Sequence, residues 1–178
     1  MKQSLKAIAL AAAILTAKAL PVHAQEAEPP MDMDRMGEIL RALDPDTTAF
    51  PSGFELTLAD VPIMVVADPV ADRMRAMIPI RSVAGMSGAE LGRVLQANFD
   101  TALDARYAVA NGRLWAVFIH PLSPLEQDQL ISGIGQTVNI ALSYGDTYSG
   151  GAVVFGGGDT ARAQRALIDE LLRRGQEL

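Results

Sequence analysis

His120 is the residue on which acid–base or nucleophilic chemistry in this chain would depend. The chain has two histidines and no cysteine, and His23 lies in an N-terminal segment that we expect to be removed. A hydrolytic triad needs a nucleophile, a base and an orienting acid within hydrogen-bond reach. Ser123 is close by, but Ser123-Pro124-Leu125-Glu126 has the pattern of a helix-capping box. We predict no catalytic residues and a structural place for His120 at a strand end. A hydrolase-type enzyme using His120 stays an alternative.

Metal and cofactor sites need ligand patterns that this sequence does not contain. A single histidine outside the N-terminal segment and the lack of cysteine exclude an ordinary zinc site. Asp44-Pro45-Asp46 and the stretch from Asp68 to Asp72 do not match a calcium loop and are typical of turns. Gly156 to Thr160 is rich in glycine, but it lacks the lysine of a phosphate-binding loop. We predict no metal and no cofactor.

Two sets of polar side chains are candidates for binding a partner. Arg73 and Arg75 alternate along one face of a predicted strand, and guanidinium groups bind carboxylates bidentately. The simpler interpretation of this arginine row is a solvated face paired with Asp and Glu across the strands. Tyr148 lies in the loop 145–151, where tyrosine among Gly and Ser can form an adaptable contact surface. A plain loop is the simpler interpretation there.

The segment 114–119 is apolar on both of its faces. Trp115, Val117 and Ile119 alternate with Leu114, Ala116 and Phe118. An antiparallel sheet usually keeps one face in water, so a strand of this kind must be covered twice. The cover comes from the terminal helix or from another chain, either a second copy or a client. We predict that Trp115, Val117 and Ile119 form a partner-binding surface.

The N-terminus has the pattern of a secretory signal peptide. Lys2 and Lys6 precede an almost unbroken apolar run, 7–17, which is too short to span a bilayer. We predict cleavage after Ala24, with Ala19 as the second choice, and a linker over 25–31. The product is expected to be periplasmic or secreted.

Removal of residues 1–24 makes the protein strongly acidic. All three lysines lie in that segment, so 12 arginines and 21 acidic residues leave a net charge of −9. Nucleic acid and anionic membrane surfaces both require a basic footprint. We therefore exclude nucleic acid, and after cleavage the membrane, as partners.

The elements that position these residues follow from hydrophobic periodicity and capping signals. Predicted helices and strands, in chain order, are helix 32–43, strands 54–58, 62–67 and 72–81, helix 88–104, strands 106–110 and 113–120, helix 124–144 and helix 160–174. Ser87-Gly88-Ala89-Glu90 predicts a helix-capping box, Asn111-Gly112 predicts a tight hairpin, and Pro79 places its strand at an edge or a bulge. Antiparallel strands grouped between helices predict an α+β domain over 32–178 with about five strands.

This order, α-β-β-β-α-β-β-α plus a C-terminal helix, resembles the type III secretion chaperone-like fold. The local sequence is similar to YbjN-type domains, in the phrases 72–75 (DRMR), 78–80 (IPI), 97–108 (ANFDTALDARYA) and 114–122 (LWAVFIHPL). The resemblance covers about residues 32–155. It implies a protein-binding role, homodimers that hold non-globular client segments on apolar patches, and no catalytic residues.

These observations together predict a non-catalytic, chaperone-like protein-binding module of the bacterial periplasm. Its partner would be another protein or a second copy of itself. A small-ligand-binding domain, with a pocket between sheet and helices, is a further alternative.

Overall fold

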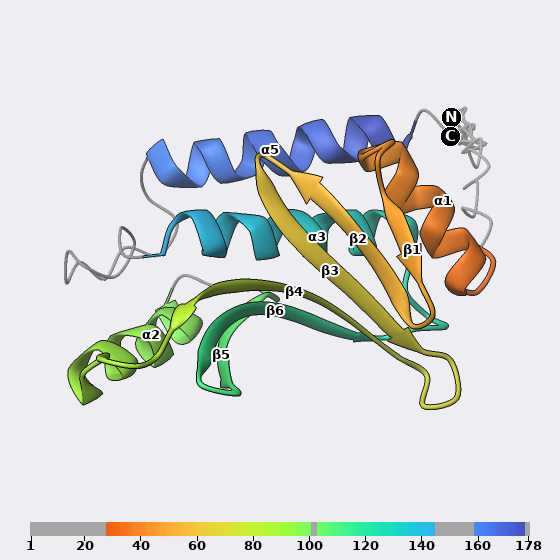
Figure 1. Ribbon diagram of the computed structural model, residues 1–178. Helices are drawn as coiled ribbons and strands as arrows, with labels where there is room; N and C mark the ends of the chain where they lie inside the picture. Colours follow the sequence, from red (N-terminus) through yellow and green to blue (C-terminus); the bar gives the residue numbers. More distant parts are fainter. Residues whose placement is uncertain (1–27, 101–102, 145–158, 177–178) are drawn as a thin grey trace, which may run out of the picture.

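The computed structural model describes residues 28–100, 103–144 and 159–176. Within them one six-stranded antiparallel sheet has the order β1-β2-β3-β4-β6-β5, and helices lie against it (Figure 1). The strands are β1 (Thr48–Phe50), β2 (Gly53–Leu58), β3 (Val61–Asp68), β4 (Arg73–Ser82), β5 (Arg106–Ala110) and β6 (Arg113–Pro121). The helices are α1 (Met33–Leu43), α2 (Gly88–Asp100), α3 (Gln127–Leu142) and α5 (Asp159–Gly175). The predicted α+β class is confirmed.

Strand β1 is the element that raises the predicted strand number from about five to six. The sequence places Thr47 to Ser52 in a loop, but Thr48 pairs with Glu55 and Phe50 pairs with Gly53 of β2. Three residues are too few to show the alternation by which a strand is recognised.

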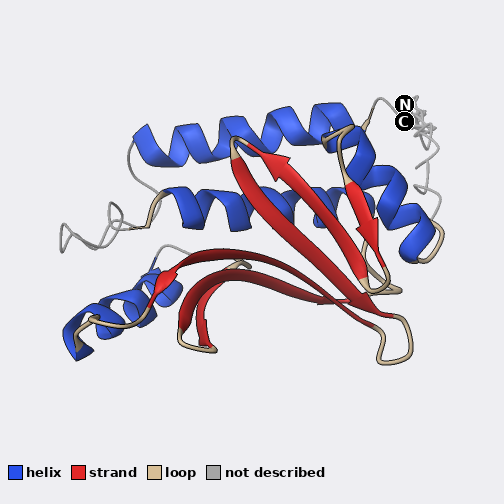
Figure 2. Ribbon diagram, in the orientation of Figure 1, coloured by secondary structure: helices blue, strands red, loops and turns tan. Residues whose placement is uncertain are grey.

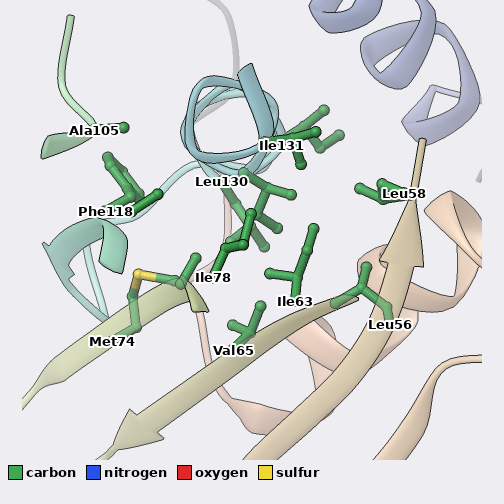
Figure 3. Packing of buried hydrophobic residues seen from close by; sticks show 14 of the residues in the cluster. Leu56, Leu58, Ile63, Val65, Met74, Ile78, Ala105, Phe118, Leu130 and Ile131 are labelled. Carbon is green, nitrogen blue, oxygen red and sulfur yellow. The ribbon is translucent and has the colours of Figure 1, made fainter. Parts of the chain in front are cut away.

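One face of the sheet, called the inner face, packs on α3. Its side chains come from alternate positions of four strands and are at most 6% exposed: Leu56, Ile63, Val65, Met74, Ala76, Ile78, Leu114, Ala116 and Phe118. Figure 3 shows Ile63 and Ile78 pointing toward Leu130 and Ile131 of α3. Each large aliphatic side chain buried in this way contributes about 1.5–3 kcal/mol, so the inner face accounts for much of the stability.

Helices α3 and α5 form two layers on the inner side of the sheet. Helix α5 packs along α3 and also contacts α1, and α3 and α5 run side by side in Figure 2. Within the described ranges, no helix has both the length and the apolar character that crossing a bilayer requires.

Several local signals are confirmed at the atomic level. The Asp32 carboxylate caps α1 by accepting the N–H of Arg35 at 2.8 Å. Ser87 and Glu90 form the predicted capping box, with Glu90 N donating to Ser87 Oγ at 3.2 Å and Ser87 N donating to Glu90 Oε2 at 2.8 Å. Asn111 (φ 51°) and Gly112 (φ 71°) have the two positive φ angles that a tight hairpin requires.

The predicted start of the third long helix is wrong. Helix α3 begins after Glu126, whose N–H donates to Gln129 Oε1 at 3.1 Å, and Ser123 is not its cap. The sequence fits a helix cap at Ser123 and a helix cap at Glu126. Contacts of Ser123 with residues distant in the chain decide in favour of Glu126. The prediction that Pro79 marks an edge or a bulge is confirmed by the bulge between Pro79 and Arg81, and β4 itself is flanked by β3 and β6.

Gly133 of α3 is expected to be essential for the packing of α3 on the sheet. A Cβ at this position would lie 2.5–2.7 Å from three ring atoms of Phe118. Gly133→Ala should lower the free energy of unfolding by about 1–3 kcal/mol, because overpacking outweighs the helix-propensity gain of up to about 1 kcal/mol. Urea denaturation measures the change.

Gly92 of α2 provides the matched control. A Cβ there has no neighbour within 4 Å. Gly92→Ala should therefore raise stability by up to about 1 kcal/mol. Equal responses of the two variants would contradict the described contact between α3 and Phe118.

Candidate protein-binding surface

The apolar strand β6 has one covered and one uncovered face. Leu114, Ala116 and Phe118 point to the inner face and are buried. On the opposite side, called the outer face, Trp115 and Val117 are half-buried and Ile119 is 53% exposed. The structure thus brings the three residues predicted to bind a partner onto one surface.

The terminal helix does not cover this outer face. Helix α5 packs on α3, where Leu171 is buried and Gly175 lies against Ile131. Helix α2 lies at the free edge of β5, where the side chain of Asn98 pairs with both backbone groups of Tyr107 at 2.7 and 3.0 Å. Of the two kinds of cover predicted for β6, the terminal helix is therefore not the one on the outer face, and no other described helix lies there.

Strand register aligns a row of side chains across the outer face. Glu55 pairs with Met64, Met64 with Met77, Met77 with Val117, and Val117 with Arg106. At about 4.8 Å between strands, this row is about 19 Å long. It is acidic at the β2 end, apolar in its centre and basic at the β5 end. The two methionines in it are half-buried and adapt readily to a bound surface.

Arg73 and Arg75 lie exposed on the same outer face. Arg73 is opposite Asp68 of β3, and Arg75 lies between Val66 of β3 and Ile119 of β6. In the part of the chain that the structure describes, neither guanidinium makes an ion pair within 4.0 Å. Both cations therefore border the apolar row and are available to a carboxylate of a partner.

Tyr148, the remaining candidate, lies outside the described residues. Tyr144, the residue just before this loop, is described, and its ring packs edge-on against Tyr107 at a centroid distance of 6.3 Å. The Tyr107 hydroxyl in turn donates to the Ile140 carbonyl at 2.6 Å. Tyr144 is therefore part of the packing between α3 and β5.

His120 has no catalytic partners among the described residues. Its ring stacks on Phe118, with centroids 5.9 Å apart, and its Nδ1 lies 2.8 Å from the Pro121 carbonyl oxygen. The nearby Ser123 hydroxyl donates to Asp72 Oδ2 at 3.1 Å. Within the same ranges, no group of three or more His, Asp or Glu side chains is arranged to hold a metal ion.

A hollow of about 460 Å³ lies at the β1–β3 end of the outer face. It is lined by carboxylates, threonines and apolar groups of the α1–β1 connection and four strands: Asp44, Asp46, Thr48, Glu55, Leu56, Thr57, Pro62, Ile63, Met64 and Pro79. A pocket predicted between sheet and helices would lie on the opposite side. The sequence signal for this hollow, Asp44-Pro45-Asp46, is indistinguishable from a turn.

A second set of exposed apolar residues, called the α2 patch, comes from α2, from the segment that follows it and from β5. Leu95 and Phe99 of α2 are 66% and 77% exposed, and Leu103 and Val109 are 67% and 54% exposed. The apolar positions of the predicted helix include Val94, Leu95 and Phe99, but of these only Val94 is buried, together with Ala97. The sequence pattern identifies an apolar face without telling which chain covers it.

No protein-family profile and no curated protein matches this chain. Among solved structures, the chain is similar to one in the ExsC–ExsE complex, with TM-score 0.52 and 9% identity over 65% of this chain and 95% of that chain. It also matches the Yersinia pestis type III secretion chaperone SycH in complex with a fragment of YscM2, with TM-score 0.45 and 14% identity over 60% of this chain and 96% of that one. The match to the ExsC–ExsE chain, with a TM-score above 0.5, shows a shared α+β fold and agrees with the secretion chaperone-like element order predicted from the sequence.

Asp72 should stabilise the fold through its ionised carboxylate. The backbone N–H of Ser123 (2.7 Å), followed by its hydroxyl, donates to Asp72 and lowers the pKa of that carboxyl. Asp72→Asn keeps a side chain that tolerates the left-handed φ of 50° but removes the charge. The variant should be less stable than the original protein near neutral pH.

The pH dependence of this loss has a definite sign. A carboxyl group whose pKa is lower in the folded than in the unfolded state stabilises the fold at pH values above its unfolded-state pKa of about 3.9. This stabilisation disappears as the pH falls through the folded-state pKa. The difference in urea midpoint should therefore shrink as the pH falls below about 5. Asp60→Asn, at an exposed turn residue, is the control. A pH-independent difference for Asp72→Asn would contradict a role for its charge.

Proposed function

We propose that this chain is a non-catalytic, chaperone-like protein-binding module of YbjN type that holds non-globular client segments on the outer face. The observation that carries the proposal is the apolar set Trp115, Val117 and Ile119, which the terminal helix leaves uncovered. Apolar surface bordered by charged residues, here Arg73 and Arg75, is typical of protein interaction sites.

The surroundings of His120 support binding over catalysis. Its ring is engaged with Phe118, and the adjacent serine hydroxyl bonds Asp72 instead of the imidazole. A triad needs a direct contact between the nucleophile and the base. The described residues provide none, so the hydrolase alternative has no geometric support.

The proposal assigns the α2 patch to a second copy of the chain. Phe99, Leu95 and Leu103 are more exposed than any of the three outer-face residues, and a monomer rarely leaves such a cluster in water. A dimer formed through α2 would leave the outer face of each subunit open to a client.

The proposal also places the protein in the periplasm. Its signal peptide, residues 1–24, is removed, and its domain spans residues 32–178. The first described residues after the expected cleavage point make contacts with the domain. Glu28 Oε2 accepts the N–H of Gln127 at 2.9 Å, Met31 N donates to the Ser123 carbonyl at 3.1 Å, and Met31 is buried. Cleavage after Ala24 preserves these contacts.

Photocrosslinking in the native host tests the binding surfaces. Benzoylphenylalanine at Ile119 should capture a client, and the same group at Phe99 should give a product of twice the chain mass. At the exposed Arg165 of α5 it should give neither. With the captured client purified, Ile119→Asp should weaken binding about tenfold or more, because a buried apolar contact is lost.

A His120→Ala variant separates the chaperone and enzyme hypotheses, because loss of a phenotype with the fold intact would favour the enzyme. His120→Ala should leave client affinity unchanged. Equal crosslinking from Ile119 and Arg165, or full affinity in Ile119→Asp, would show that the outer face is not the binding surface.

Export is tested by fractionation and mass spectrometry. The periplasmic protein should begin at Gln25, and Ala24→Arg should accumulate the precursor because the peptidase requires a small residue at that position. Recovery of the uncleaved chain in the cytoplasm would contradict the proposed compartment.

A further inference from the structure

The hollow on the outer face combines an apolar wall with a carboxylate rim. Pro62, Met64 and Pro79 supply apolar lining, and Asp46 and Glu55 supply exposed carboxylates. Its volume of about 460 Å³ is within the range of ligand pockets, about 300–1,000 Å³. A ligand that fits both parts has an aliphatic stem and a polar, positively charged end.

The carboxylates of the rim differ in how they are engaged. Asp44 accepts the N–H of Asp46 at 3.0 Å and the N–H of Thr57 at 2.8 Å, so it holds the α1–β1 connection against β2. In the described ranges, neither Asp46 nor Glu55 accepts a hydrogen bond through its carboxylate or pairs with a cation within 4.0 Å. Asp44 thus has a structural role, and the other two are available to a ligand.

Charge complementarity determines which ligand this is. No lysine or arginine lines the hollow, and the chain as a whole carries a net charge of −6. The row that begins at Glu55 continues over Met64 and Met77 to Val117. A segment lying along this row meets carboxylates first and apolar side chains next.

We propose that the hollow binds an arginine or lysine side chain of the client, which is followed along the client by apolar residues. This inference rests on the proposed function and adds the chemistry of the client. The aliphatic stem of the basic residue lies on Met64, Pro62 and Pro79, as such stems do on apolar surface. Its charged head reaches Glu55 and Asp46, with charge-assisted hydrogen bonds.

A pair of synthetic peptides tests the role of the charge. The probes are the blocked hexapeptide Ala-Arg-Val-Leu-Val-Ala and its twin with citrulline, which has the shape of arginine without its charge. The ¹³C-methyl NMR signal of Met64 reports on the hollow. Fluorescence of Trp115, the only tryptophan of the chain and the cross-strand partner of Pro79, reports on the outer face.

The arginine peptide should bind about five- to tenfold more tightly than the citrulline peptide, since partly screened charge-assisted contacts have this magnitude. The ratio should fall to about one in Glu55→Gln/Asp46→Asn. It should persist in Glu38→Gln/Asp169→Asn, which removes the same two charges from exposed positions on α1 and α5.

The outcomes separate this inference from the proposed function. Equal affinities of the two peptides, with both perturbing Trp115, would overturn the basic-residue inference and leave an apolar binding face. A preference for arginine that survives in Glu55→Gln/Asp46→Asn would also overturn it. No response of Met64 to either peptide at millimolar concentration contradicts the inference as well, and crosslinking from Ile119 then decides the proposed function separately.

Discussion

The constraint on which this structure depends is that β6 is apolar on both faces, while the described helices that cover its sheet lie on only one. Burial of Leu114, Ala116 and Phe118 beneath α3 fixes the strand register, because a slip of one residue would exchange the two faces. The same register necessarily places Trp115, Val117 and Ile119 on the outer face. The alternating pattern of β6 therefore has two results. Its inner residues stabilise the fold, and its outer residues are left without a covering helix.

Helix α3 explains why the terminal helix cannot cover the outer face. Its residues from Gly133 to Ile140 are all buried, because the sheet lies on one side and α5 on the other. Small residues allow both contacts, since a Cβ on Gly133 would meet Phe118 and a Cβ on Gly135 would meet Ile168 at 2.9 Å. Helix α5 buries its apolar side on α3, and no described element remains for the outer face.

The sequence predicts those features that depend on residues close together in the chain. Three features are examples: the Ser87–Glu90 box, the Asn111-Gly112 turn and the alternation in β6. Each of them forms because of residues that are neighbours in the sequence. Features that depend on distant residues were missed or misplaced. Ser123 fits a cap by its neighbours but bonds Asp72, and the hollow exists only because the β1–β2 register places Thr48 beside Glu55.

The charges that end the outer-face row have consequences beyond affinity. Glu55 lies at one end, and Arg106 lies about 19 Å away at the other, with Arg75 beside the row. A uniformly apolar face would hold an extended segment equally well in either direction. Opposite charges at the two ends favour one direction for a segment that is itself basic at one end and acidic at the other, because the reverse placement puts like charges together. Under the proposed function, apolar burial supplies the affinity of this face, and its charged ends supply the orientation.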